Sequence, residues 1–420
     1  MKRFGNRFEI QGINVQEICC RYGTPLYVYD ADTICRQVET FREAMHGLNF
    51  QIKYAAKALT NLSILKLMKA LGTGLDTVSV PEIRMGIEAG FCPNQIVFTP
   101  NCVDFSEIEE AVELGVFINL ESLSSLEKFG KRYGGEVPCC LRLNPFIVAE
   151  DNREKVDWWH QQSKFGIADA QLGEARRLIA KYSVQIKGIH IHSSSVIMNP
   201  EVFCKGVETV FGVAEQFDEL DFIDFGGGLK VKHREEDKVI DIYELGRGLK
   251  SAYVDFVKRC GRDVQLWFEP GRYLVSESGF LCVRANVVKS NGSRTFVGVD
   301  SGFNQLIRPM FYGAYHEIVN LSNPDGKPSS YTVVGNVCEI DNFAVDRRLP
   351  QTREGDLLAI KNAGSYGYMM ASNYNSRYRP AEVLVIDGEA RLIRRRDTYE
   401  DLVRNQLAID IPQEALMNDA

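Results

Sequence analysis

Short runs of β-prone residues alternate with helix-compatible segments through the first two thirds of the chain. The runs lie at residues 52–56, 74–78, 95–99, 116–120, 138–144, 186–192, 222–226 and 264–269. Between them, apolar residues recur at the three- and four-residue spacing of amphipathic helices, as at 61–72, 104–115 and 171–180. This alternation predicts a parallel sheet joined by helical crossovers. Eight repeats favour an α/β fold closed into a (β/α)8 TIM barrel, with an open doubly wound sheet as the alternative.

The pattern changes after residue 275, where turn-forming stretches replace the helices. The β-prone runs there lie at 279–288, 295–300, 331–338, 356–362 and 381–387. They predict a mostly antiparallel β-barrel or sandwich domain. The early run LYVYD (26–30) is expected to join this domain, and TYEDLVRNQLA (398–408) to form the last helix. Because 420 residues are too many for one compact domain, we expect a barrel over 36–274 and a β domain made of 1–35 and 275–420.

Composition excludes several classes of function. A net charge of −7 argues against nucleic acid as a partner, since phosphate backbones need a basic surface. No apolar stretch approaches the ~20 residues that span a bilayer, and the N-terminal MKRFGNRFEI lacks the apolar core of a secretory signal. The eleven cysteines form no C-x-x-C pair and no zinc-like spacing with histidine. We therefore expect a cytoplasmic protein with free thiols, no metal, and neither nucleic acid nor membrane as a partner.

Polar and glycine residues gather where the predicted barrel strands end, which is the end of such barrels that carries the active site. They are Lys57, Asp76, Arg142, Asn144, His192, Gly226, Gly227, Gly228, Glu269 and Arg272. Their convergence makes this end a candidate site. Lys57 closes an apolar strand, so burial would lower its pKa and make it a nucleophile of the kind that forms Schiff bases. The alternative is a lysine whose amine reaches solvent at the barrel rim.

Three of these features would suit an aromatic cofactor that carries a phosphate group. The glycines at 226–228 would let backbone N–H groups approach an anion, although a flexible turn is the simpler interpretation. Glu269 could pair with a protonated pyridine nitrogen, or form a salt bridge with neighbouring Arg272. His190 and His192 share one face of their strand. His192, nearer the strand end, could lie flat against a ring, whereas His190 is better explained as a structural histidine.

Motifs spread over nearly the whole chain resemble those of the fold-type III pyridoxal-phosphate decarboxylases, and within them the diaminopimelate decarboxylase family. In chain order they are YAAKA (54–58), GLDTVS (74–79), LRLNP (141–145), SKFGI (163–167), HIHSSS (190–195), FGGG (225–228), EPGR (269–272), VDSGFNQLIRPMFY (299–312), CE (338–339), GSYGYMMASNYN (364–375) and SNYNSRYRPAEV (372–383). Each motif is weak alone, and their shared order is specific. The resemblance implies a pyridoxal-phosphate-dependent carboxy-lyase that converts meso-2,6-diaminopimelate to L-lysine and CO2, the last step of lysine biosynthesis.

The same resemblance implies how the cofactor, pyridoxal 5′-phosphate, is held. Lys57 resembles the lysine that binds it covalently, His192 the histidine that stacks on its ring, and Glu269 the partner of its pyridine nitrogen. The positions that resemble phosphate-side contacts are Ser195, Gly226, Gly227, Gly228, Arg272 and Tyr366, and Gly271 is a further cofactor-binding position. Asp76 and Arg142 resemble supporting residues near the cofactor.

The resemblance also implies how a small amino-acid substrate is bound. The positions that resemble its binding groups are Arg272, Arg308, Tyr312, Glu339 and Tyr366. Cys338 resembles the acid that reprotonates the carbanion, and Glu339 the group that reads the distal ammonium. In such enzymes these two residues come from the neighbouring subunit, which implies an obligate homodimer with shared active sites. Ornithine has no distal carboxylate for the fork of Arg308 to bind, so Arg308 favours diaminopimelate.

A few positions depart from the family's pattern. Ser194 stands where glycine is usual, Asn336 where proline is usual, and Asp341 where a small or neutral residue is common. These changes affect loops and spare the reactive groups. The long polar segment 147–162, which contains Trp158 and Trp159, is expected to form a mobile lid over the barrel mouth.

Three other functions stay open at this point. A related decarboxylase could act on ornithine, arginine or carboxynorspermidine. An amino-acid racemase could use a similar barrel, but it would have no use for the CE and IRPMFY motifs. A catalytically inactive homologue could act as a regulator, although this chain keeps Lys57, Glu269, Arg308 and Cys338 together.

Overall fold

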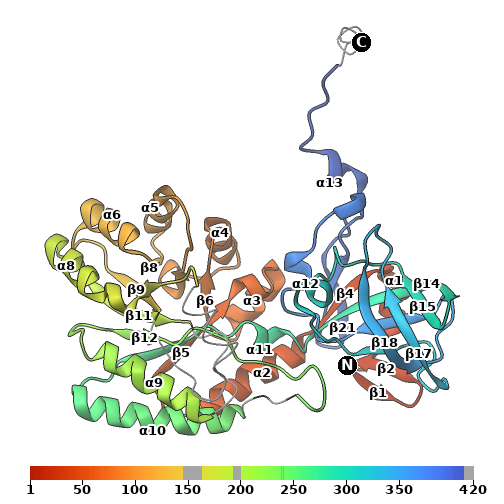
Figure 1. The fold of residues 1–420 in the computed structure, drawn as a ribbon, viewed down its shortest axis with the longest axis horizontal. Coiled ribbons are helices and arrows are strands. Elements are labelled where there is room, and N and C mark those ends of the chain that lie inside the picture. Colours follow the sequence, from red (N-terminus) through yellow and green to blue (C-terminus); the bar gives the residue numbers. More distant parts are fainter. Residues whose placement is uncertain (145–162, 193–199, 238, 240, 411–420) are drawn as a thin grey trace.

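The computed structural model describes residues 1–144, 163–192, 200–237, 239 and 241–410, which fold into two units lying side by side (Figure 1). Ser194, Ser195 and the segment 147–162 lie outside these described residues, so the expected lid stays a prediction. None of the described helices combines the length and the apolar character needed to cross a membrane.

One unit is a closed barrel of parallel strands. Its strands are β5 (Phe50–Ala55), β6 (Gly74–Thr77), β7 (Ile96–Phe98), β8 (Phe117–Leu120), β9 (Cys139–Asn144), β11 (Ile186–Ile191), β12 (Phe222–Asp224) and β13 (Gln265–Phe268). The ring closes because β13 pairs with β5 and β8 pairs with β9. A short strand, β10 (Ile167–Ala168), also pairs with β9. The strands coincide with the β-prone runs of the sequence, so the TIM barrel is confirmed and the open sheet is wrong.

Helices surround the barrel (Figure 1). They are α2 (Ala31–Ala44), α3 (Leu62–Ala70), α4 (Val80–Glu88), α5 (Phe105–Glu113), α6 (Leu123–Tyr133), α8 (Leu172–Tyr182), α9 (Pro200–Ala214), α10 (Ile242–Cys260) and the short α11 (Arg272–Val275). Side chains that accept a backbone N–H fix several starts, as Asn61 does for α3 and Asp104 for α5. Because each helix returns the chain to begin the next parallel strand, all strand carboxyl ends meet at one end of the barrel.

The second unit is built on a mostly antiparallel sheet. Its strands are β4 (Leu26–Asp30), β14 (Gly279–Asn291), β15 (Arg294–Val299), β16 (Ile318–Asn320), β17 (Pro328–Val334), β18 (Asn342–Pro350), β19 (Leu357–Ile360), β20 (Ala381–Ile386) and β21 (Glu389–Arg394). The main order is β18-β17-β15-β14-β4-β20-β21; off this path, β19 pairs with β14, and β16 pairs with β19. The pairs β15–β17 and β4–β20 are parallel. The expected membership of residues 26–30 in this sheet is confirmed, since β4 lies between β14 and β20.

The sequence pattern did not indicate several elements, and for others it indicated a different extent. The remaining elements are β1 (Lys2–Phe4), β2 (Arg7–Ile10), β3 (Ile13–Asn14), α1 (Val15–Tyr22), α12 (Arg308–Tyr312) and α13 (Tyr399–Val403). Helix α13 covers only part of the expected 398–408. The division of the chain at residues 36 and 274 stays a prediction, and residue 36 itself lies inside α2.

A buried carboxylate joins the two units. Glu382 of β20 has no exposed surface. It accepts hydrogen bonds from the Tyr29 hydroxyl of β4 at 2.7 Å and from the amide of Asn61, which caps barrel helix α3, at 3.0 Å. Arg394 of β21 donates to the same carboxylate. One side chain therefore fixes the central strand, the outer strand and a barrel helix relative to one another.

Glu382→Ala is expected to lower the free energy of unfolding by about 3 kcal/mol, because it leaves buried donors and a cation without their acceptor. Urea denaturation of the purified protein measures the change. Glu389→Ala is the control, since it breaks an exposed ion pair with Arg391 and should cost less than about 1 kcal/mol. Equal effects of the two substitutions would contradict this assignment.

Candidate active site

Lys57 follows β5 in a short 3-10 turn (Ala56–Ala58), at the end of the barrel where the strands finish. Its Nζ donates to Oδ2 of Asp76 at 2.5 Å. Asp76 lies on β6 and is completely buried, whereas the Lys57 side chain keeps 31% of its surface exposed. The amine is thus tied to the neighbouring strand and still open toward the barrel mouth.

The expected lowering of the Lys57 pKa is wrong. Burial does pull this pKa down, but the negative charges of Asp76 and Glu269 outweigh it, and the pKa lies above the ordinary value. For Asp76, burial and repulsion from Glu269 raise the pKa, despite the opposing pull of Lys57. The sequence could not show this, because the deciding partner lies 19 residues away on another strand.

Glu269 follows β13 and is almost fully buried, at 2% exposure. Its Oε2 lies 3.2 Å from Nε2 of His190 and 3.8 Å from Nδ1 of His192. Burial alone would raise the pKa of Glu269, but the two histidines outweigh it and hold the pKa well below its usual range. Nearby Asp224 is affected oppositely, since burial and the charge of Glu269 raise its pKa well above normal. Glu269 therefore carries the negative charge of this pair.

No ion pair joins Glu269 to Arg272 among the described residues, so the salt-bridge alternative is not supported there. The donor atoms of His190, His192 and Glu269 lie within 4.8 Å of one another, a spacing that could also hold a metal ion. The hydrogen bond of His190 to the carboxylate and that of the Gly227 N–H to Nδ1 of His192 account for the same closeness.

The glycines at 226–228 form a tight turn under His192. Gly226 has φ +65°, and a Cβ there would lie 2.6 Å from Nδ1 of His192. The N–H of Gly227 donates to that nitrogen at 3.2 Å, and the N–H of Glu269 donates to the carbonyl of Gly226 at 2.8 Å. Burial lowers the pKa of His192 to about 4, so its ring is neutral at neutral pH. Glycine is needed here for close packing, which a merely flexible turn would not require.

Tyr366, Arg272 and Arg308 approach this site from the β domain and the end of the barrel. Tyr366 has φ +55° and donates its N–H to the carbonyl of Ala58, next to Lys57, at 2.9 Å. The Arg272 guanidinium lies 5.9 Å from the Tyr366 ring centre. Arg308, on α12, is 8% exposed and lies 5.6 Å from the ring of Tyr312. Burial, followed by repulsion from nearby Arg272, lowers the pKa of Arg308.

Several buried polar atoms of the site have no hydrogen-bond partner among the described residues. They are Oε1 of Glu269, Oδ1 of Asp76, Nδ1 of His190, Nε of Arg272 and Nε of Arg308. Buried polar atoms are normally paired. A cationic ring nitrogen suits an ionised carboxylate, and an anionic ligand suits the arginines. The N–H groups of Gly226 and Gly227 already donate to Asp224 and His192. The residues present therefore fit a phosphorylated pyridine cofactor.

Cys338 and Glu339 are exposed on a loop of the β domain. Their side chains meet the turn at 374–375: the Tyr374 hydroxyl donates to Glu339 at 2.9 Å and lies 3.5 Å from Sγ of Cys338. Asn375 Nδ2 donates to the same sulfur at 3.2 Å. Hydrogen bonds from Tyr374 and Asn375 lower the pKa of Cys338.

The structure also places the remaining expected residues and three that sequence reasoning undervalued. Arg142, 8% exposed, stacks on Phe165 at 4.6 Å, and Gly271 packs against Ala58 of the Lys57 turn. The undervalued residues are His190, Asp224 and Lys53. His190 shares the face of His192, and Asp224 precedes the glycine turn, so period-two alternation signalled both. Lys53 is buried at 1%, with its Nζ over the Trp267 ring and its pKa lowered by burial to about 8.

The chain matches known proteins over almost its full length. Residues 31–276 match the model of the pyridoxal-dependent decarboxylase pyridoxal-binding domain. A diaminopimelate decarboxylase of Methanothermobacter thermautotrophicus is 39% identical over 407 residues, covering 94% of this chain and 95% of that protein. The crystal structure of the M. jannaschi diaminopimelate decarboxylase matches with TM-score 0.90 and 30% identity over 97% of this chain and 98% of that one.

Fold, site and comparisons together define the class: the chain is a pyridoxal-phosphate-dependent decarboxylase with the fold-type III architecture. Pyridoxal 5′-phosphate is accordingly its cofactor. A Helicobacter pylori diaminopimelate decarboxylase complexed with L-lysine is also similar, with TM-score 0.84 and 34% identity over 93% of this chain and 98% of that one. Within the class, the chain belongs to the diaminopimelate decarboxylase family.

Proposed function

We propose that this enzyme converts meso-2,6-diaminopimelate to L-lysine and CO2, as the last step of lysine biosynthesis. The observation that carries the proposal is the pair of guanidiniums at the barrel mouth, Arg272 and Arg308, each with an unpartnered Nε. Two neighbouring cations that repel each other are costly without an anion, and the distal carboxylate of diaminopimelate supplies one. The similar H. pylori and M. jannaschii enzymes were crystallised with L-lysine, the product of this reaction.

Pyridoxal phosphate, when bound, supplies an electron-poor ring that takes up the electron pair left when the carboxylate carbon is lost. Glu269, ionised through its histidine contacts, is suited to hold the protonated pyridine nitrogen. The neutral ring of His192 is suited to stack on the cofactor ring. On family resemblance, the phosphate side is assigned to Ser195, the glycine turn at 226–228 and Tyr366, and Gly271 is assigned to cofactor binding.

Lys57 Nζ is the group that we assign to covalent attachment of the cofactor. A protonated amine is not a nucleophile, so Lys57 must first lose a proton. Oδ2 of Asp76, at 2.5 Å, is the nearest acceptor, and its raised pKa makes it a better base than an ordinary aspartate. Asp76 would therefore store that proton, and Arg142, also near this end of β9, would balance the negative charges of Glu269 and Asp76.

The proton that completes the reaction is assigned to Sγ of Cys338, and recognition of the distal ammonium to Glu339. We propose that both act in the active site of the partner subunit of a homodimer. Exposed apolar side chains follow Glu339 in the chain and lie on helix α12: Ile340 is 83% exposed, Met310 48% and Phe311 65%. Exposed apolar groups at this density favour a protein interface. The ten described cysteines are all free, which agrees with work in a reducing cytoplasm.

The substrate assignment is tested by measuring product formation from meso-diaminopimelate, ornithine, arginine and carboxynorspermidine with purified protein and added cofactor. Diaminopimelate is expected to have a kcat/KM at least ~100-fold above the others, because a site built for a charged group rejects substrates that leave it unpaired. Equal or faster turnover of ornithine or arginine would sink the assignment, and turnover of none would revive an inactive homologue.

Arg308→Lys is expected to raise KM for diaminopimelate by about 10- to 100-fold with a smaller change in kcat, because an ammonium group cannot replace a two-point guanidinium contact. Steady-state kinetics measure the two constants separately. Arg353→Lys, on the exposed surface, is the matched control and should leave both unchanged. An unchanged KM in Arg308→Lys would remove Arg308 from substrate binding.

A further inference from the structure

Cys338 is held at two points by one side chain. Its backbone N–H donates to Oδ1 of Asn375 at 2.9 Å, and Nδ2 of Asn375 donates to its Sγ at 3.2 Å. The amide therefore fixes both the backbone and the sulfur of Cys338. Asn375 adopts φ +54°, a left-handed conformation that costs a non-glycine residue free energy and persists where surrounding contacts enforce it.

Tyr374 connects the thiol to the carboxylate beside it. Its hydroxyl donates its single proton to Oε1 of Glu339 at 2.9 Å, which leaves the oxygen to accept the S–H of Cys338 at 3.5 Å. The thiol then donates to Tyr374 and accepts from Asn375. When the sulfur gives up its proton, the Asn375 N–H still stabilises the negative charge, and the Tyr374 hydroxyl can turn its proton from Glu339 to the sulfur, the hydrogen bond that lowers the pKa of Cys338. The arrangement suits both protonation states of a group that must release a proton.

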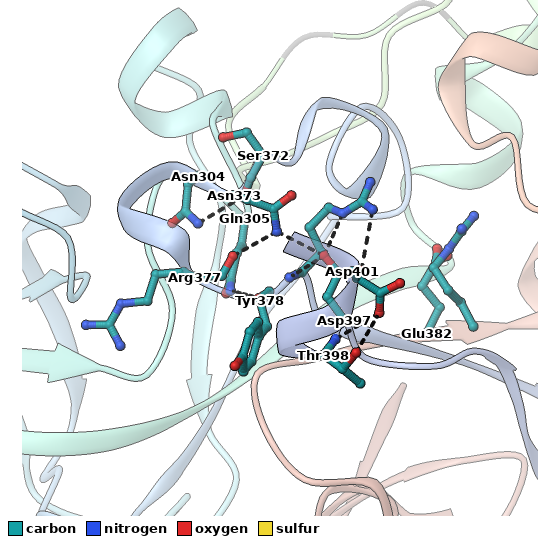
Figure 2. Close-up of polar contacts among 12 residues, drawn as sticks. Asn304, Gln305, Ser372, Asn373, Arg377, Tyr378, Glu382, Asp397, Thr398 and Asp401 are labelled. Atoms are coloured by element: carbon teal, nitrogen blue, oxygen red, sulfur yellow. Dashed lines mark hydrogen bonds and ion pairs between the residues drawn. The ribbon is translucent and has the colours of Figure 1, made fainter. Parts of the chain in front are cut away.

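The turn that carries Tyr374 and Asn375 is anchored at both ends, as Figure 2 shows. On one side, Asn373 donates to Asp397 at 2.9 Å and to the carbonyl of Arg377 at 2.9 Å. On the other, Gln305 donates to the carbonyl of Tyr378 at 2.8 Å (Figure 2). The turn cannot move without breaking these bonds.

The Cys338 loop is anchored on the same stretch of chain, residues 301–305. The N–H of Asn336 donates to the carbonyl of Ser301 at 2.9 Å, and the N–H of Phe303 donates to the buried carboxylate of Asp341 at 2.7 Å. Asp341, which departs from the family's usual small residue, is thus a loop anchor. Because the Cys338 loop and the 374–375 turn are both hydrogen-bonded to residues 301–305, the distance between them is fixed.

We propose that Asn375 and Tyr374 are positioning residues that hold the Cys338 thiol and the Glu339 carboxylate in one rigid unit, Asn375 aiming the proton and Tyr374 setting its distance from the ammonium-reading carboxylate. This inference rests on the proposed roles of Cys338 and Glu339 and assigns the two residues that make those roles geometrically possible. The two residues should affect different kinetic constants: Asn375 contacts only Cys338 and should affect kcat, whereas Tyr374 also contacts Glu339 and should affect KM.

The test compares Asn375→Gly with Ser376→Gly. Both positions have φ +54°, so glycine relaxes the backbone equally at each. Only Asn375→Gly removes the two hydrogen bonds that hold Cys338. Asn375→Gly is expected to lower kcat about 10- to 100-fold with KM within about threefold, since it removes a hydrogen bond to a group that becomes charged. Ser376→Gly should keep the wild-type kcat. Tyr374→Phe should raise KM about fivefold or more, because Glu339 loses its donor.

A double-mutant cycle distinguishes positioning from general damage. If Asn375 acts through the thiol, adding Asn375→Gly to Cys338→Ala changes kcat by no more than about threefold. Multiplied losses, or an unchanged kcat in Asn375→Gly alone, would overturn the inference and leave the acid role of Cys338 standing. A wild-type kcat in Cys338→Ala would remove both, while lysine release from diaminopimelate in the same assays would still support the proposed reaction. For each variant, an unchanged cofactor absorption band and an assembly of the same size as the wild-type protein show that the fold is intact.

Discussion

Replacing Lys57 with alanine is expected to remove the absorption of covalently bound cofactor and to lower kcat on the order of 10⁴-fold or more, the scale of loss when a covalent nucleophile is removed. Lys57 is the lysine that combines an open position at the barrel mouth with a proton acceptor, Asp76, at 2.5 Å. Absorption spectra of the purified variant with added pyridoxal phosphate, followed by single-turnover assays, measure both effects.

Lys53 provides a sharp control for this prediction. It lies on β5, four residues before Lys57, and its pKa of about 8 would make it the more reactive amine at neutral pH. It is buried at 1%, however, and its Nζ donates to the carbonyl of Gln95 at 3.2 Å inside the barrel. Lys53→Met should therefore keep the cofactor band. If the band survives in Lys57→Ala and disappears in Lys53→Met, Lys53 holds the cofactor, and its lower pKa matters more than the open position of Lys57.

Replacing Cys338 with alanine is expected to leave the cofactor band intact and to lower kcat by about 10²- to 10⁴-fold, the usual contribution of a general acid. The substrate should still bind, because Arg272, Arg308 and Glu339 are unchanged, so KM should move little. Steady-state kinetics at saturating diaminopimelate measure the loss. A kcat close to wild type would exclude the thiol as the proton donor.

Mixing the two inactive variants tests the shared site directly. After subunit exchange, half of the dimers combine one Lys57→Ala chain with one Cys338→Ala chain, and each such dimer has one site with both native residues. The mixture should recover about a quarter of the wild-type activity if Lys57 and Cys338 act across a two-fold interface. Each variant mixed with itself is the control. Failure to recover activity, with exchange verified by mass, would place both residues in one chain.

The barrel could be predicted because its buried parallel strands are continuous apolar runs with helical spacing between them. Strand β18 (Asn342–Pro350) escaped prediction for a physical reason. Its central residues are charged and exposed, and its pairing with β17 shifts register, so neither alternation nor an apolar run marks it. Tertiary pairing alone makes this segment a strand.

For the candidate site, too, the sequence indicated some features and could not indicate others. Residue types at strand ends identified Lys57, His192 and Glu269, because chain order alone brings strand ends together in a barrel. Protonation states could not be predicted in this way, since each depends on a partner elsewhere in the chain, as the Lys57–Asp76 pair shows. Cys338 is hydrogen-bonded to Tyr374 and Asn375, which follow it by 36 and 37 positions in the chain. No local sequence pattern indicates these contacts.

The place of β4 in the middle of its sheet also determines how the molecule can be assembled during synthesis. This strand is synthesised long before its neighbours, since β4 ends at residue 30 and β14 and β20 begin only at residues 279 and 381. The barrel sequence can collapse while the chain is still growing, but the apolar β4 stays unpaired until β14 is made, and it keeps one open edge until β20 follows. A chain that stops before β20 would expose one edge of β4, the kind of bare strand that seeds aggregation.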